Sequence, residues 1–358
     1  MAHPVPLQSF LGGLSIPIPV HALTLLNGNV FGISGFIHRA VKGNVEGAAG
    51  ALGLVLGGML VAQLDGKAPA ALALPLSQIA LSGLLVGLGT KLSNGCTSGH
   101  MVCGLSRLSL RSLAATVSFF TTGVITASLL HSDLPAVGTF DWTLGASGAK
   151  YLAYQAFPLA ASALLYFLAP RTSDQTPSSI TEASEQTTLL SPAESSSATP
   201  PAPASKEPTL TPQPSGYQPL LRTLAFVTTS VQFALALQLS GLTDPIRVLS
   251  FLLLPFHKAF DPSLAFLAAG ALPLGIALYR YARGNEIPRL GGKWSIPKPG
   301  SIDTKLVLGA AIFGVGWGMA GVCPGPGLVN LGRAIAAGGD ILPFATFLAT
   351  LITGGLLV

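Results

Sequence analysis

The sequence predicts an all-α membrane protein with about nine transmembrane helices, re-entrant half-helices and two inverted repeats. Three observations lead to this fold class. Only 9% of the 358 residues are charged whereas 49% are apolar, and the mean hydropathy is +0.60. Long apolar segments alternate with short breaks rich in glycine, asparagine and proline. The same order of segments occurs twice, on either side of a polar stretch.

The composition also excludes several classes of protein. A soluble protein of this length needs a charged surface that this chain cannot supply. The net charge of +5 comes from basic residues next to apolar segments, so it indicates membrane topology and no nucleic-acid binding. Three cysteines do not form a disulfide framework, and no zinc-type spacing is present. Because the sequence has no cofactor motif, nucleotide loop or ATPase signature, we expect neither a cofactor nor an enzyme.

The first half, residues 1–169, is expected to form the first membrane repeat. Its first span, Leu7–Leu26, carries Pro17 and Pro19 and should be distorted there. After a break beginning at Asn27, the apolar piece that ends at Arg39 is too short to cross a bilayer, which predicts a re-entrant half-helix. Further crossings are expected at Val45–Leu64, Leu72–Leu92, Leu110–Leu130 and Tyr151–Ala169.

Residues 170–218 differ from the rest of the chain. They are dominated by serine, threonine, proline, glutamine and glutamate and show no apolar periodicity. Such a segment cannot bury a core, so we expect a disordered linker between the two halves.

The second half, residues 219–358, repeats the order of the first. A span at Leu221–Leu239 leads into a break at Gly241–Pro245 and a half-helix at Ile246–Phe256. Further spans are expected at Leu264–Tyr281, Leu306–Ala320 and Leu342–Val358, with a short helix at Leu328–Ala337.

Spacings within the two halves agree as well. A glycine pair lies nine and seven positions before Cys96, and another lies nine and seven positions before Cys323. Counting full crossings gives about five before the linker and about four after it. Since an odd number of crossings turns the second half over relative to the first, the repeats are predicted to be inverted.

Two breaks carry the candidate site residues. Asn94–Arg107 contains two of the three cysteines and Gly321–Gly327 contains the third. In the first, the hydroxyls of Thr97 and Ser98 can cap a helix that begins after Cys96; in the second, a proline follows the cysteine and suits the first turn of a helix. Both loops would then present a thiol and free N–H groups at a helix start, where anions bind. The candidate substrate-binding residues are Cys96, Cys323, Cys103, Gly95, Thr97, Ser98, Gly99, His100, Pro324 and Gly325.

Two of these residues have open roles. Cys103 lies seven residues after Cys96, which in an α-helix is two turns further on the same face and about 10 Å along the axis. It is either part of a row of thiols or a small core residue. His100 either caps or hydrogen-bonds locally or contacts the substrate.

The segments Asn94–His100 and Cys103–Ser112, with Gly314–Pro326, Gly241–Phe251 and Asp261–Phe266, resemble the signatures of the YeeE/YedE family of sulfur-compound transporters. The resemblance covers both halves and excludes the linker. It implies a multi-pass membrane protein that takes up thiosulfate, with Cys96 and Cys323 as the loop cysteines that contact the anion in turn. Thiosulfate-transporting members also carry a cysteine in the first half-helix region, where this chain has Ser34. A persulfide, polysulfide, sulfite or related anion is therefore an alternative substrate.

We accordingly expect a transporter whose partners are the lipid bilayer and a small sulfur-containing anion. The alternative is a membrane sulfur-transfer protein that carries a cysteine persulfide to a soluble sulfur-carrier protein. A third interpretation is a structural membrane protein with incidental thiols. Basic residues are more frequent on the linker side, which predicts that this side is cytoplasmic. We expect the plasma membrane, with the vacuole or another endomembrane as alternatives.

Overall fold

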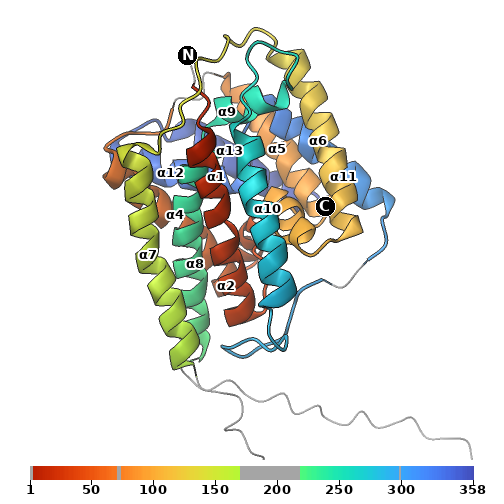
Figure 1. The fold of residues 1–358 in the computed structure, drawn as a ribbon. Helices are drawn as coiled ribbons and strands as arrows, with labels where there is room; N and C mark the ends of the chain where they lie inside the picture. The colour runs from red at the N-terminus through yellow and green to blue at the C-terminus, as the bar shows by residue number, and fades with distance from the viewer. Residues whose placement is uncertain (1–2, 71–73, 170–217, 298–299) are drawn as a thin grey trace, which may run out of the picture.

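The computed structural model describes residues 3–70, 74–169, 218–297 and 300–358, and within these ranges the protein contains helices and no strands (Figure 1). The predicted linker, up to residue 217, lies outside the described residues. The elements of the first half are α1 (Pro6–Ser15), α2 (Pro17–Asn27), α3 (Ile33–Val41), α4 (Val45–Asp65), α5 (Leu76–Leu92), a π-helical turn η1 (Ser98–Gly104), α6 (Leu110–Leu130) and α7 (Gly145–Leu168). Those of the second half are α8 (Gln218–Ser240), α9 (Pro245–Leu252), α10 (Ser263–Tyr281), α11 (Thr304–Ala320), α12 (Pro324–Ala337) and α13 (Leu342–Leu356).

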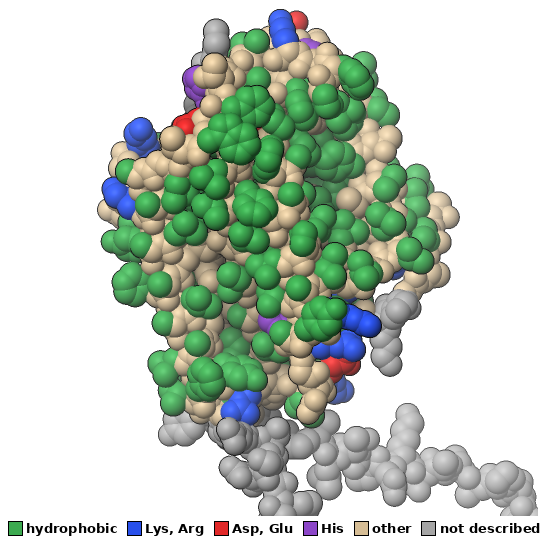
Figure 2. Space-filling view, in the orientation of Figure 1, with side chains coloured by type: hydrophobic (Ala, Val, Ile, Leu, Met, Phe, Trp, Pro, Cys, Tyr) green, Lys and Arg blue, Asp and Glu red, His purple; other side chains and the backbone are tan. Residues whose placement is uncertain are grey.

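Many of these helices are built to cross a membrane. In the described part of the chain, seven helical segments are long and apolar enough to do so; α1 with α2, and α11 with α12, each count as one segment. The shorter helices α5 and α13 are also apolar. In Figure 2 the middle of the visible face is covered by hydrophobic and uncharged side chains, and the charged ones lie toward its upper and lower ends. This distribution is the one that a bilayer requires of an integral membrane protein.

The ends of the helices follow from local signals. The Asn44 side chain accepts a hydrogen bond from the Gly47 N–H at 2.7 Å and starts α4, and Asp303 accepts one from the Leu306 N–H at 2.8 Å to start α11. Gly321 ends α11 with a left-handed φ of 67°. An L-residue with a side chain rarely adopts this conformation, so glycine is favoured at that position.

Several predicted boundaries are confirmed and others are wrong. α7 begins at Gly145 and not at Tyr151, and α12 begins at Pro324 and not at Leu328. The first span breaks at Ile16–Pro17, as the prolines predict, and α6 has the predicted bounds. The half-helix predicted to reach Phe256 ends at Leu252. Leu254 adopts a left-handed φ of 62° and is followed by proline, which disfavours helix in the residue before it.

The two halves are interleaved, and helices at equivalent positions make equivalent contacts. α4 packs along α8 as α10 packs along α1, and α5 packs along α13 as α11 packs along α6. α5 and α11 pack against each other in opposite directions, because Ser82 Oγ donates to Gly316 O at 2.7 Å while Gly89 faces Gly309 one or two turns away. The main buried surfaces of each half are therefore formed against the other half.

Candidate functional site

The first cysteine loop follows α5 directly. Asn94 adopts a left-handed φ of 59°, and the Ser93 hydroxyl donates to Gly89 O at 2.7 Å and to Gly95 O at 3.0 Å. A Cβ on Gly95 would lie 2.8 Å from Nε2 of His100, so this position has no room for a side chain. These contacts turn the chain sharply just before Cys96.

The hydroxyls that follow Cys96 bond to sulfur and do not cap the helical turn that begins after them. Thr97 occupies the N-cap position of η1, yet no side-chain cap hydrogen bond forms, which corrects the prediction made for Thr97 and Ser98. Ser98 Oγ lies 3.2 Å from Cys96 Sγ and accepts a hydrogen bond from the Ile33 N–H, also at 3.2 Å. Ser98 thereby attaches the loop to the start of α3.

The second cysteine loop has the predicted form. Cys323 is extended, with φ −95° and ψ 162°, at the N-cap of α12, and Pro324 begins the helix. A Cβ on Gly325 would lie 2.6 Å from Cδ1 of Ile33, so a side chain at this position would have to displace the end of the Ile33 side chain. The Gly327 N–H donates to Cys323 O at 2.9 Å and starts the helical hydrogen-bond pattern.

The structure brings the two loops together. Thr97 Oγ1 donates to Cys323 Sγ at 3.5 Å, across 226 positions of the sequence. Cys96, Thr97, Ser98 and Gly325 all line one cavity of about 20 Å³. Cys96 is 1% exposed and Cys323 is 3% exposed, so both thiols are closed off from solvent.

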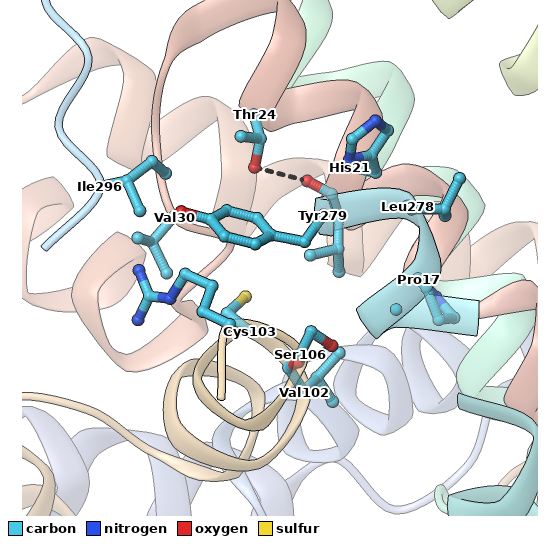
Figure 3. Close-up of a pocket in the computed structure, with 13 residues that line it drawn as sticks. Pro17, His21, Thr24, Val30, Val102, Cys103, Ser106, Leu278, Tyr279 and Ile296 are labelled. Atoms are coloured by element: carbon cyan, nitrogen blue, oxygen red, sulfur yellow. Dashed lines mark hydrogen bonds between the residues drawn. The ribbon is translucent and has the colours of Figure 1, made fainter. Parts of the chain in front are cut away.

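Cys103 lies apart from this pair. Its Sγ donates to Phe31 O at 3.6 Å, and it lines a different cavity of about 30 Å³ with Ser106 and Tyr279 (Figure 3). Val102 lines both cavities, and the α-helical spacing predicted between Cys96 and Cys103 is not the one observed. Cys96 precedes the helix, and η1 is a π-helix whose i to i+5 hydrogen bonds change the rotation per residue.

His100 and Gly99 have different surroundings. The His100 ring lies between the Ser93 carbonyl oxygen, 3.2 Å from Nε2, and the Ser112 hydroxyl, 3.4 Å from Nδ1. This buried histidine thus makes the local hydrogen bonds that were one of its two predicted roles and connects the cysteine loop to α6. No atom lies within 4 Å of a Cβ built on Gly99, so space does not explain that glycine.

A larger cavity of about 360 Å³ lies beside the first loop, at the end of the molecule to which the linker attaches. Gly95, Gly99 and His100 form part of its wall, and the rest includes the basic residues Arg39, Lys91, Arg107 and Arg111. Sequence reasoning did not include Arg107 and Arg111 among the candidate site residues and missed the cavity. The signal available in the sequence was that both arginines closely follow the cysteine motif.

Metal ligands are not arranged around these cavities. Within the described ranges, no group of three or more histidine, cysteine, aspartate or glutamate side chains is placed to hold a metal ion. The chemistry available at the centre is that of thiols, hydroxyls and the N–H groups at the start of α12.

A helical membrane body in which broken helices meet is found in many transporters. Comparison with known proteins agrees. Residues 11–126 match the family described as "Sulphur transport", and residues 221–358 match a family of unknown function, DUF6691. A "probable transporter" of Xylella fastidiosa strain 9a5c is 39% identical over 123 residues, which are 34% of this chain and 91% of that protein. Another "probable transporter", from strain Temecula1, is 35% identical over 129 residues, which are 36% of this chain and 84% of that protein.

The chain belongs to the sulphur transport family of the YeeE/YedE type and is an integral membrane transporter. No solved protein structure matches it. Both relatives are shorter than half of this chain, since a stretch of about a third of it covers most of their length.

Proposed function

We propose that the protein takes up a small sulfur-containing anion, with thiosulfate as the first candidate, past Cys96 and Cys323. The observation that carries the proposal is the hydrogen bond from Thr97 Oγ1 to Cys323 Sγ, which joins the two cysteine loops at the centre of a family member. Two thiols contributed by separate halves, inside a membrane body, suit a ligand that has both a negative charge and an exposed sulfur atom.

The proposed membrane topology has nine crossings in two inverted repeats. Seven long apolar segments together with α5 and α13 supply the nine. The equivalent pairs α4 with α8 and α10 with α1, and the opposite directions of α5 and α11, support an inverted relation. α3, η1, α9 and α12 are the broken or half-helices that such transporters place near the midplane.

The thiols and the start of α12 have complementary tasks in this mechanism. The first turn of α12 directs backbone N–H groups toward the loop, and these offset part of the charge of an anion. Because the Thr97 hydroxyl donates to Cys323 Sγ, the S–H of Cys323 is free to donate to the terminal sulfur of the anion. S–H groups are weak donors, so the anion is held loosely enough to be released onward.

Transport requires the two loops to separate. A cavity of about 20 Å³ is near the size limit for a single water molecule and is too small for thiosulfate. The closed conformation thus corresponds to an occluded state between openings toward the two sides of the membrane.

The proposed orientation places the linker and the basic cavity in the cytoplasm. The linker-side end of the molecule carries Arg39, Lys91, Arg107 and Arg111, and such an excess of basic residues is retained on the cytoplasmic side. The proposed location is the plasma membrane, and fusion to a fluorescent protein would test it against the vacuole and other endomembranes.

Uptake of radiolabelled thiosulfate by cells that lack their own transporter tests the proposal. We expect uptake above the vector control, reduced by competing unlabelled sulfur anions that the protein accepts. Absence of uptake for thiosulfate, sulfite and polysulfide, in cells where the protein reaches the membrane, would contradict the function. Mass spectrometry of Cys96 and Cys323 after exposure to substrate separates transport from the sulfur-transfer alternative, which requires a covalent persulfide on one of them.

A single substitution at Thr97 tests the contact between the loops. Thr97→Val keeps the shape of the side chain and removes the hydroxyl that donates to Cys323 Sγ. We expect thiosulfate uptake to fall by about threefold to tenfold, because a neutral hydrogen bond contributes about 0.5–1.5 kcal/mol. Thr97→Ser retains the hydroxyl and is the matched control. Equal uptake by the valine and serine variants would show that this contact has no part in transport.

A further inference from the structure

Among the described residues, the cavity beside the first cysteine loop is lined by several positively charged side chains and by no carboxylate. We call it the basic vestibule and define it by the four cationic residues Arg39, Lys91, Arg107 and Arg111, which come from α3, α5 and the segment around the start of α6. Neither aspartate nor glutamate is among the described residues that line its volume of about 360 Å³. The vestibule therefore concentrates positive charge at one end of the molecule.

Within the part of the chain that the structure describes, no carboxylate forms an ion pair with these four cations; Glu46, which attracts Arg39 from a greater distance, is itself paired with Arg222. The ion pairs found there are those of Arg222 with Glu46, Arg247 with Asp261, Arg283 with Glu286 and Arg333 with Asp65. None of the four includes a vestibule residue. A group of like charges without counterions raises the free energy of the folded protein unless an anion binds between them.

Some of the guanidinium atoms are also buried without a hydrogen-bond partner. This holds for Nε of Arg39 and for both Nε and Nη1 of Arg107. Buried N–H donors normally have partners, because leaving them unsatisfied is costly. In the vestibule the missing partner has to be an acceptor, and an anionic oxygen forms the strongest bond to a guanidinium group.

Arg107 occupies a junction between cavities. It lines the vestibule, the cavity that holds Cys103, and an adjoining cavity of about 560 Å³ that also contains Arg280 and Arg283. The lining of the vestibule also includes Gly95 and Gly99 of the cysteine loop. An anion bound at Arg107 would therefore lie between the cysteine loop and the linker-side mouth of the protein.

We propose that the basic vestibule is a binding site for a small doubly charged oxyanion, with Arg107 and Arg111 as the main donors. The site recognises charge and oxygen atoms and does not require the thiols. The identification of that oxyanion with the transported one rests on the function proposed above. The vestibule is then the compartment that the anion occupies on the linker side of the cysteine loops.

The vestibule favours a small anion over a phospholipid headgroup. Its walls are polar loops and helix ends, namely the loop that ends at Gly32, the Asn94–Gly95 turn and the Ser109–Ser112 segment. A lipid headgroup would have to bring its acyl chains along, and these need an apolar wall beside it. The experiment below distinguishes the two sources of negative charge.

Binding of radiolabelled sulfate to the purified full-length protein, in an uncharged detergent, tests the proposal. Sulfate is the probe because it has the charge and the oxygens of thiosulfate without the terminal sulfur on which the thiols would act. We expect Arg107→Gln combined with Arg111→Gln to weaken binding by about tenfold or more, since charge-assisted bonds to both guanidinium groups are lost. Arg107→Lys, which keeps the charge and loses the forked geometry, should be intermediate.

A matched control removes two charges from the same end of the molecule. Lys42→Gln combined with Lys305→Gln changes the net charge equally, and both lysines are exposed and lie outside the vestibule. We expect this variant to bind sulfate within about twofold of the parent, because exposed charges are screened by salt. Equal losses in the two double variants would overturn the proposal by showing a non-specific charge effect. Binding that anionic phospholipid displaces but unlabelled sulfate does not would overturn it as well.

The cysteine variants separate this inference from the proposed function. Cys96→Ser combined with Cys323→Ser should bind sulfate as the parent does, since neither thiol lines the vestibule. Unchanged sulfate binding in the Arg107, Arg111 variant would contradict the vestibule and leave thiol-dependent transport standing. Normal transport by the double cysteine variant, with sulfate binding lost in the arginine variant, would contradict thiol-dependent transport and support the vestibule.

Discussion

Replacing Cys96 and Cys323 together with serine is expected to reduce thiosulfate uptake by about tenfold or more. Each substitution removes one S–H contact to the terminal sulfur of the anion, and two contacts of about 1 kcal/mol each correspond to a factor of this size. Serine cannot replace them, because its harder oxygen prefers backbone carbonyls and water to a soft sulfur atom. Initial uptake rates, normalised to the amount of protein in the membrane, measure the effect.

Two comparisons keep this result interpretable. Cys103→Ser makes the same change of sulfur to oxygen in a different cavity from the one that Cys96 lines, so its loss of uptake should be smaller. Elution of the double variant as a single species in size-exclusion chromatography shows that it still folds. If the folded double variant transports as well as the parent, the thiol mechanism is wrong and the loops act only through their shape and N–H groups.

Gly58→Ala is expected to destabilise the protein strongly. A Cβ at Gly58 would lie 2.0 Å from Val329 O, and a Cβ at Gly332 would lie 2.0 Å from Val55 O, so α4 and α12 are in backbone contact through a reciprocal glycine pair. Because the clash is with backbone, no rotamer relieves it and the helices have to move apart. We estimate a cost of about 2–3 kcal/mol, at the upper end of the range for overpacking and partly offset by the higher helix propensity of alanine.

The same substitution also bears on function, since α12 begins at the second cysteine loop. Displacing α12 moves Cys323 away from Thr97, so uptake should fall together with stability. The apparent melting temperature in detergent, followed by tryptophan fluorescence, measures the loss of stability. We expect it to drop by several degrees.

Gly35→Ala is the matched control for this stability prediction. Gly35 lies within α3, and no atom lies within 4 Å of a Cβ built there. The substitution should stabilise the protein by about 0.5–1 kcal/mol, because alanine favours helix. Similar losses of stability for Gly58→Ala and Gly35→Ala would contradict the reciprocal contact between α4 and α12.

Close helix contacts of this kind recur between the halves. A Cβ built on Gly87 would lie 2.0 Å from Leu351 O and one built on Gly354 would lie 2.2 Å from Leu84 O, so α5 and α13 are in close backbone contact in the same reciprocal way. In lipid, apolar side chains gain little by leaving the solvent, so helices associate through close packing of small residues. Close backbone contact between helices therefore explains why glycine is so frequent in the chain.

Local features of the sequence were sufficient to predict most of the helices. Hydropathy located α4, α6, α10 and α11 to within two residues at each end, because a bilayer imposes both a length and a composition on a crossing helix. Proline predicted the break between α1 and α2 and the start of α12. Glycine and asparagine located the cysteine loops, because they permit the left-handed conformations found at Asn94 and Gly321.

The hydrogen-bond partners and cavities of the site could not be predicted from local features of the sequence. Thr97 and Ser98 were predicted as caps because serine and threonine do cap helices, but their hydroxyls bond to cysteine sulfur. A π-helical turn replaces the α-helical spacing that was predicted between Cys96 and Cys103. The basic vestibule combines residues from α3, α5 and the start of α6, which have no common pattern in the sequence.

The sequence by itself determined an all-helical membrane protein with repeated halves, two cysteine loops and a family relationship. These properties depend on the composition and order of short segments. In a bilayer each apolar segment has to satisfy its own backbone hydrogen bonds, so it forms a helix whatever its neighbours are. Only the tertiary structure decided that Thr97 faces Cys323, that Cys103 lies in a cavity of its own, and that four cations share a vestibule without a carboxylate. The reason is physical: many helices of similar apolar composition can pair in many ways, and the choice among these pairings is made by close packing over the whole structure.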